Sequence, residues 1–227
     1  MAQTLPAPWR AKLTEQITKR PGQEFALATV ANGTGSGSNS GPVPRVRECA
    51  FRGFFPNTSS VRDDVKKMIQ QEFDLPYTLK SPIFGDVESD LISFTTDERM
   101  DKVDQMNTSG GAVEALFYLR DISTQWRIKG RGCIFGAPGG EEGAGGSGQE
   151  QFREQEARRE IGRRLRWKDL SSTSDWNGDG DGHLQFGWEK AVTVYFANQT
   201  PVLRGNMKVN VVIWLAFPLL TLTYRFI

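Results

Sequence analysis

The chain has 227 residues, of which 28 are lysine or arginine and 27 are aspartate or glutamate, so its formal net charge is +1. A charge this close to zero argues against a protein that bulk charge holds on a nucleic acid or an anionic membrane. Two cysteines, Cys49 and Cys133, are too few for a disulfide framework, and the single His183 excludes a metal centre with several histidine ligands.

Two glycine-rich runs interrupt the chain. Residues 33–41 read GTGSGSNSG, and residues 136–148 read GAPGGEEGAGGSG. Such runs bury little apolar surface, so we expect flexible insertions at 32–42 and 136–150. The N-terminus lacks the charged start and apolar run of a secretory signal, and we therefore expect a cytoplasmic protein.

The first half of the chain predicts a helix and a hairpin. Apolar residues recur at helical spacing over 9–17, and residues 24–30 and 45–54 read as two strands joined by the first insertion. Alternation in the second strand divides its side chains between two faces. One face carries Arg47, Cys49 and Phe51, and the other carries Glu48, Ala50 and Arg52.

The remaining elements show no regular alternation of strand and helix. Helices are predicted over residues 60–73, 97–106, 149–170 and 188–198, and strands over 90–96, 113–119 and 125–135. The apolar stripe of the long third helix is Phe152, Ala157, Ile161 and Leu165. This order indicates mainly antiparallel β-structure with peripheral helices.

Two charged segments invite a functional interpretation. Residues 153–168 carry seven basic and three acidic side chains, which suits either a phosphate contact or a solvated helix face; the balanced total charge favours the solvated face. The loop from Asp175 begins like a calcium-binding EF-hand, but Gly182 and Phe186 break the pattern. We therefore favour a solvated turn and expect no metal.

Polar residues gather where a predicted strand passes into a short helix. Thr95, Thr96, Arg99 and Lys102 lie at this junction. The N–H groups of a helix N-terminus attract phosphate, and threonine, arginine and lysine side chains complete such a site. Gln125 opens a later strand, where its amide is able to meet the edge of a heterocycle. The chain contains no GxSxG or Walker A motif, and no GxGxxG that follows a predicted strand and precedes a helix.

Several short segments are recognisable when they are taken together. In chain order they are APWR (7–10), FALATV (25–30), PRVRECAFRGF (44–54), FTTDERMDK (94–102), the strand that contains Glu114, QWRIKGR (125–131) and YFANQTPVLRG (195–205). This set resembles the pyridoxamine 5'-phosphate oxidase-like FMN-binding split-barrel family, in the branch distinct from the vitamin B6 enzyme proper. The resemblance implies an FMN-binding split β-barrel over residues 1–208 and a homodimer with FMN at its interface.

The resemblance also implies the residues of the flavin site. The matching positions are Arg47, Glu48, Cys49, Ala50, Phe51, Arg52, Thr95, Thr96, Arg99, Lys102 and Gln125. Backbone contacts to the flavin ring correspond to residues 48–51, and Gln125 matches a glutamine that is often supplied across the dimer. The FMN phosphate is close to a dianion, and Arg47, Arg99 and Lys102 are suited to bind it.

The chain departs from the family pattern at several positions. Met100 replaces a serine, Asp101 replaces a second basic residue, and Gln199 stands where the B6 enzymes have a substrate-phosphate arginine. Pyridoxine-phosphate oxidation is therefore not expected. We expect a flavin-dependent oxidoreductase with a small-molecule substrate that the sequence does not identify. The alternatives are a non-catalytic flavin-binding module and a truncated product without cofactor.

The resemblance stops near Val209. Residues 209–227 form an atypical apolar tail whose uninterrupted core, Val211 to Leu220, is about ten residues, short of the roughly 20 that span a bilayer. Three interpretations stay open: a strand that ends the barrel, a sequence switch from an altered gene model or splice form, and a marginal tail anchor. A membrane partner is therefore not the favoured expectation.

Overall fold

A computed structural model describes most of the segments named above. The described residues are 5–19, 23–33, 41–56, 63–65, 67, 87–135, 148–167, 188, 191–192, 197–198, 209–216 and 222–225. The helices are α1 (Arg10–Thr18), α3 (Asp101–Thr108) and α4 (Gly148–Gly162), with a short 3-10 turn at Arg120–Ile122. The strands are β1 (Glu24–Ala31), β2 (Val43–Ala50), β3 (Phe54–Phe55), β4 (Val87–Glu88), β5 (Leu91–Asp97), β6 (Ala112–Leu119), β7 (Thr124–Phe135), β8 (Arg166–Trp167), β9 (Val209–Ala216) and β10 (Leu222–Arg225).

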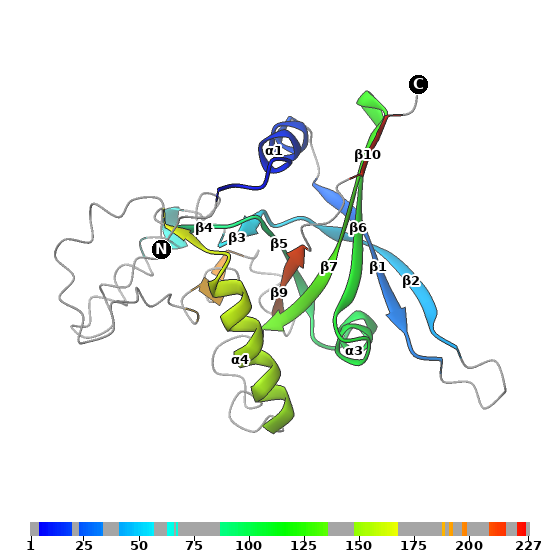
Figure 1. Cartoon of the computed structure of the whole chain (residues 1–227), viewed down its shortest axis with the longest axis vertical. Coiled ribbons are helices and arrows are strands. Elements are labelled where there is room, and N and C mark those ends of the chain that lie inside the picture. Colours follow the sequence, from blue (N-terminus) through cyan, green and yellow to red (C-terminus); the bar gives the residue numbers. More distant parts are fainter. Residues whose placement is uncertain are drawn as a thin grey trace.

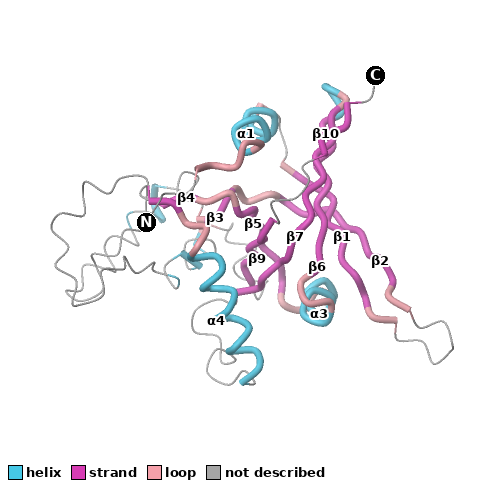
Figure 2. The backbone as a smooth tube through the Cα atoms, viewed as in Figure 1, coloured by secondary structure: helices cyan, strands magenta, loops and turns pink. Residues whose placement is uncertain are grey.

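One large sheet dominates the molecule. Its strands run in the order β2-β1-β6-β7-β9-β5-β3, with β10 also paired to β7, and β4 and β8 form a separate pair. Every described strand pair is antiparallel. The helices lie around the sheet, with α1 and α3 toward opposite ends of β7 (Figures 1 and 2). The prediction of mainly antiparallel β-structure with peripheral helices is confirmed.

The β1–β2 hairpin sets the face on which the candidate site is built. Its register pairs Leu27 with Arg47 and Thr29 with Arg45, so odd-numbered residues of both strands share the inner face. The chain that leaves β2 then crosses to β5, where the backbone of Ser93 bonds to both Arg52 and Gly53. The sheet therefore curls back toward its own edge, as a split barrel requires.

Two apolar clusters hold the fold together. The larger lies under α1 and includes Leu13, Phe25 and Phe117. The rings of Phe25 and Phe117 stack with their centroids 5.0 Å apart. The smaller lies under α4 and includes Phe135 and the fully buried Ile161. Burial of each such side chain contributes about 1.5–3 kcal/mol relative to exposure, so these clusters fix both helices on the sheet.

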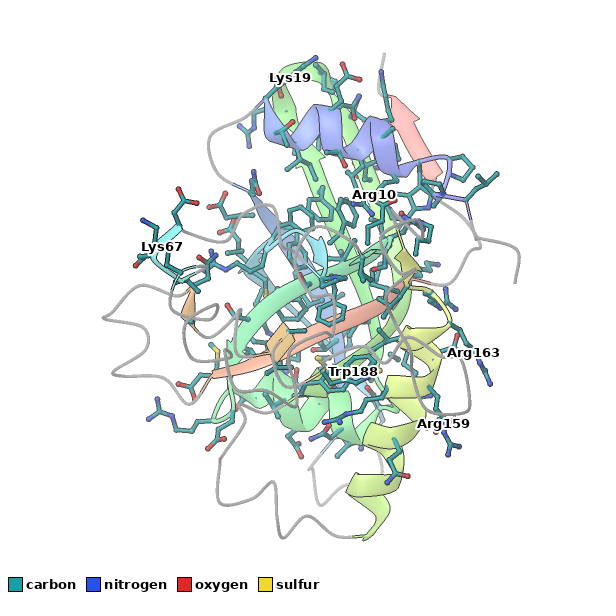
Figure 3. The ribbon with its side chains drawn as sticks, turned by 90° about the vertical axis from the view of Figure 1, so that its left-hand side faces the viewer. Arg10, Lys19, Lys67, Arg159, Arg163 and Trp188 are labelled. Atoms are coloured by element: carbon teal, nitrogen blue, oxygen red, sulfur yellow. The ribbon has the colours of Figure 1, made fainter. Side chains whose placement is uncertain are left out.

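A partly buried ionic cluster, which we call the Asp90 cluster, joins three distant segments. The Asp90 carboxylate accepts hydrogen bonds from Arg166 Nη1 (2.7 Å) and Nη2 (2.8 Å), from Arg10 Nη1 (3.0 Å) and from the Ala7 amide (2.8 Å). The Arg10 guanidinium also lies 3.7 Å from the centre of the Phe54 ring, where α1 meets the sheet (Figure 3). The cluster therefore links the N-terminal helix, the start of β5 and the segment that follows α4.

Two predicted helix boundaries are wrong. Helix α3 begins at Asp101 rather than 97, because the Asp97 carboxylate accepts from the Arg99 amide (3.0 Å) and closes a turn before the helix. Helix α4 ends at Gly162 rather than near 170. The guanidinium of Arg166 pairs with Asp90 and Glu88, and its backbone pairs with β4, so the chain is extended there.

The segment set apart as an atypical tail takes part in the sheet. Strand β9 lies between β7 and β5, and β10 pairs with the start of β7. The loop from Asp175 and His183 lie outside the described residues, as do most positions of the helices predicted over 60–73 and 188–198. Within the described ranges, none of the helices combines the length and hydropathy needed to cross a lipid bilayer.

Candidate functional site

The most connected polar group in the predicted site is Arg47. From β2 its guanidinium donates through Nη1 to Thr29 Oγ1 (2.7 Å) on β1 and through Nη2 to Gln105 Oε1 (2.7 Å) on α3. Thr29 Oγ1 in turn donates to Gln105 Oε1 (2.6 Å). Thr29 and Gln105 are 2% and 7% exposed. We call these three residues the Arg47 ring; both acceptors in it are uncharged.

A second cation, Lys102, lies one turn before Gln105 on α3. Its side chain is buried, 5% exposed, and among the described residues it makes neither a hydrogen bond nor an ion pair. Burial lowers the pKa of the Lys102 amine, and Arg47 adds to this effect; Cys49 and, to a smaller extent, the Asp97 carboxylate oppose it. Burial also raises the pKa of the Cys49 thiol, against the influence of Lys102 and Arg47. Arg47, Cys49 and Lys102 therefore share one electrostatic environment.

The strand-to-helix junction contributes three more predicted residues. Thr95 is half-buried, while Thr96 is 1% exposed and its hydroxyl donates to the Asp97 carbonyl at 3.3 Å. Arg99 is different: its side chain is 65% exposed and forms an ion pair with Asp97 at 2.6 Å. Hydrogen bonding to Asp97, with the charge of that carboxylate, raises the pKa of Arg99. The Arg99 side chain is therefore engaged by Asp97 in the turn before α3 rather than by the Arg47 ring.

The residues after Arg47 lie alternately on the two faces of the sheet, as the sequence pattern predicts. Cys49 and Phe51 are buried, with Phe51 packed edge-on against Phe54 and Phe117. Glu48 and Ala50 are exposed on the other face of the sheet. Arg52 is half-buried, and its backbone amide bonds to Ser93 (2.9 Å). The segment therefore presents backbone and two outward side chains on the outer face of β2.

Gln125 is not brought to the other predicted residues. It is half-buried at the start of β7, opposite Tyr118 on β6. Thr29 of the Arg47 ring is opposite Val113, five residues earlier on β6. At about 3.3 Å per residue, the positions of Tyr118 and Val113 are roughly 17 Å apart along β6. Within one chain, Gln125 and the Arg47 ring therefore lie at different ends of the sheet.

Two residues of the ring were not predicted. Thr29 lay inside the FALATV segment without a role, and Gln105 lay inside a predicted helix. The only local signal was that Gln105 follows Lys102 by three positions, which places both on one side of a helix. Within the described residues, no group of three or more histidine, cysteine, aspartate or glutamate side chains is arranged to hold a metal ion.

The donor set fits a phosphate group. Arg47 is partly and Lys102 almost wholly withdrawn from water. In the described part of the chain, the acceptors bonded to Arg47 are uncharged and Lys102 forms no ion pair, although the charge of the Asp97 carboxylate acts on it. Buried charge is costly unless an opposite charge compensates it. A near-dianionic phosphate would supply that compensation. Asp101, the acidic departure from the family pattern, is exposed and forms no ion pair among the described residues.

Comparisons with known proteins point in the same direction. A family model described as "Pyridoxamine 5'-phosphate oxidase, FMN-binding domain" matches residues 6–136, more than half of the chain. The search of curated proteins gave no match.

Solved structures were compared as well. A pyridoxamine 5'-phosphate oxidase-related, FMN-binding protein from Nostoc punctiforme is 17% identical, with a TM-score of 0.42; the alignment covers 92% of this chain and 81% of that one. A putative pyridoxamine 5'-phosphate oxidase from Listeria innocua is 10% identical, with a TM-score of 0.34 and coverage of 91% and 92%. General stress protein 26 from Bacillus anthracis is 12% identical, with a TM-score of 0.33 and coverage of 90% and 88%.

Proposed function

The chain belongs to the family of pyridoxamine 5'-phosphate oxidase-like FMN-binding domains, and from this premise we propose that it binds FMN with the phosphate between Arg47 and Lys102. The observation that carries the proposal is a pair of neighbouring cations, neither of which forms an ion pair among the described residues. Charge-assisted hydrogen bonds from such groups to phosphate are about twice as strong as neutral ones. The phosphate would relieve the cost of keeping both cations out of water.

The rest of the flavin is assigned to neighbouring residues. Thr95 and Thr96 lie at the same strand-to-helix junction and would hold the phosphate end and the ribityl chain. The strand residues Glu48, Cys49, Ala50 and Phe51, with Arg52, would meet the ring system. Arg99 contributes in this proposal only if its ion pair with Asp97 opens, so we assign it a secondary role.

Gln125 supports a homodimer within the same proposal. One chain keeps it at the far end of β7 from the Arg47 ring, so it would serve the site of a second copy. Such a glutamine would donate its amide to a polar edge of the flavin ring. A homodimer therefore completes the site with a residue that one chain alone does not bring there.

We further propose that the protein is an oxidoreductase of a small molecule in the cytoplasm. Bound FMN would supply the redox chemistry, and the chain would supply binding, orientation and polarity. The Arg47 ring and Lys102 would fix the phosphate end, and the buried Phe51 would pack beneath the site and exclude water.

Purification with added FMN tests the proposal. We expect the protein to keep FMN through gel filtration, with the visible absorption band of a bound flavin and the elution volume of a dimer. Protein that elutes without flavin after saturation with FMN would contradict the binding proposal. A monomer that retains FMN would contradict only the assignment of Gln125 to a second copy.

A non-catalytic flavin-binding module is the second candidate. Gln199 replaces the substrate-phosphate arginine of the B6 enzymes, and this departure favours binding without turnover. Two measurements separate the functions: reduction of the bound flavin by NADPH or NADH, seen as loss of its visible absorption, and oxidase turnover. An oxidoreductase shows one or the other, and a binding module shows neither.

A further inference from the structure

The Arg47 ring is closed, because each of its three members bonds to the other two. The three distances are 2.7 Å, 2.7 Å and 2.6 Å, all short for neutral or singly charged partners. The contacts join β1, β2 and α3, with Thr29 and Gln105 separated by 76 residues in the chain. A guanidinium held at two points on two elements has little freedom to rotate, so its orientation is set before any ligand arrives.

The ring uses only part of the hydrogen-bonding capacity of Arg47. A guanidinium carries five N–H donors, and two of them are engaged by described residues. The remaining donors are available to an anion. Because two donors are held by Thr29 and Gln105, the directions of the other three donors are fixed as well.

Helix α3 is anchored closely enough to act as one wall of the ring. Met106, next to Gln105, is 1% exposed, and its carbonyl accepts from the Gly111 amide at 2.7 Å. The Gly111 carbonyl in turn accepts from Gly132 on β7 at 2.8 Å. Gly111 has φ +83°, and an added Cβ there would come within 2.5 Å of the Gly132 carbonyl. These contacts fix the height of Gln105 above the sheet.

The acceptors are a hydroxyl and an amide rather than a carboxylate. A glutamate at 105 would bond to Arg47 equally well, but its charge would cancel the positive charge of the guanidinium. A neutral amide orients the guanidinium and leaves its charge available. This is the opposite of the Asp90 cluster, where a carboxylate accepts from two arginines.

We propose that Thr29 and Gln105 are positioning residues: they hold Arg47 in the orientation that binds the phosphate monoester of the ligand, without touching the ligand themselves. The inference rests on the proposed FMN binding and adds to it the residues that create phosphate selectivity. It explains why a buried threonine and a buried glutamine, far apart in the chain, both bond to one arginine.

Flavins with and without phosphate test the proposal. Riboflavin shares the ring and ribityl chain of FMN but lacks the phosphate. We expect Thr29→Val and Gln105→Met each to weaken FMN binding about tenfold, the loss of one well-made hydrogen bond, and to leave riboflavin binding unchanged. Thr29→Ser keeps the hydroxyl and should stay within about twofold of the original FMN affinity. Dissociation constants come from flavin fluorescence quenching on the full chain.

A double-mutant cycle separates positioning from contact. In an Arg47→Ala background, Thr29→Val and Gln105→Met should cause no further loss, because the residue through which they act is gone. Gln105→Glu keeps an acceptor of the same length, and we expect it to weaken FMN binding more than tenfold because its charge neutralises Arg47. Thermal unfolding without flavin will show whether Gln105→Met folds. If it does not fold, the Gln105→Glu variant takes its place in the affinity measurement.

The outcomes distinguish this inference from the proposed function. If the unmodified chain binds neither flavin, FMN binding is wrong and the positioning role is wrong with it. If it binds FMN but Thr29→Val and Gln105→Met leave the affinity unchanged, the positioning role alone is wrong. Equal losses for riboflavin, or losses that persist without Arg47, would mean that these residues contact the flavin directly and would also overturn the inference.

Discussion

Two partly buried arginine clusters in this molecule use opposite partners. In the Asp90 cluster, Arg10 and Arg166 share one carboxylate, and Glu88 adds a second acid at 3.4 Å from Arg166. In the Arg47 ring, the guanidinium bonds to a hydroxyl and an amide. Lys102 beside it forms no ion pair among the described residues, and the Asp97 carboxylate acts on it only through its charge. One cluster is neutral as built, and the other carries net positive charge.

The difference separates a structural role from a binding role. Buried cations that are already paired with acids tie segments together and have no further demand for charge. Buried cations with neutral acceptors raise the free energy of the protein until an anion arrives. The sign of the stability effect should therefore differ between the two clusters when a member is removed, and the following predictions test this contrast in order of expected size.

Removal of the shared carboxylate should have the largest effect. Asp90→Asn leaves Arg10 and the 5% exposed Arg166 without their acid, and we expect the free energy of unfolding to fall by about 3 kcal/mol. Urea denaturation measures this change. The matched control is Glu160→Gln on α4, where the partners Arg163 and Arg164 are 77% and 32% exposed; we expect a loss below about 1 kcal/mol there. Equal losses would contradict the structural role of Asp90.

Removal of both site cations should affect binding rather than folding. Arg47→Ala with Lys102→Ala should weaken FMN retention at least tenfold, if each side chain supplies a phosphate contact of about 1.5 kcal/mol or more. The measurement is the FMN dissociation constant of the purified double variant. The matched control is Arg127→Ala, which removes only an exposed pair with Glu114. Unchanged FMN affinity in the double variant would show that the phosphate lies elsewhere.

Replacement of Lys102 alone should stabilise the flavin-free protein. Lys102→Met keeps the apolar stem of the side chain and removes a buried charge that forms no ion pair among the described residues. We therefore expect the flavin-free protein to gain about 1 kcal/mol in unfolding free energy. The same variant should bind FMN less tightly. Thermal unfolding with and without FMN measures both effects, and a loss of stability in the flavin-free variant would contradict the contrast between the two clusters.

The two clusters should also respond to pH in different ranges. Burial would raise the pKa of the Asp90 carboxyl, but hydrogen bonds from Arg166, the Ala7 amide and Arg10 outweigh it and the pKa is lowered. Stability from Asp90 is therefore present above the ordinary carboxyl pKa near 4 and is lost as pH falls through the lower folded value. Burial lowers the pKa of Lys102 in the folded protein. The buried charge therefore destabilises the fold at every pH below this lowered pKa, and the destabilisation is relieved as pH rises from there to the ordinary lysine pKa near 10.4.

Unfolding free energies measured across pH will show both effects. In Asp90→Asn, the unfolding free energy should fall less steeply at acid pH than it does in the unmodified protein. In Lys102→Met, its rise at alkaline pH should disappear. A profile that neither variant alters would mean that other groups set the pH dependence.

Local patterns were sufficient for most of the strands but not for the contacts between them. Period-two alternation in β2 placed Arg47, Cys49 and Phe51 on one face, because a strand side is determined by residue spacing alone. The start of α3 was misplaced because the Asp97 side chain closes a turn that periodicity does not register. Helix α4 ended early because Arg166 pairs with Asp90, 76 residues away in the chain.

The candidate site shows the same limit. The phosphate-suited cations Arg47 and Lys102 were identified from their segments, and the structure brings them into one environment. Thr29 and Gln105 were missed because their roles depend on a contact between a strand and a helix distant in the chain. The separation of Gln125 from these residues follows from strand order, which the sequence did not determine.

The close approach of β7 to α3 has a consequence for genetic variation. At Gly132 an added Cβ would overlap the Met106 methyl group, and the Gly132 backbone is also in the way of any side chain at Gly111. The Met106 methyl group is the end of a flexible side chain and is able to move aside, whereas the clash at Gly111 is with backbone, at a φ of +83°. A substitution at Gly111 would therefore displace the turn that holds the end of α3, and with it Gln105. A random-mutation screen for lost flavin binding should recover changes at Gly111 alongside changes at Arg47.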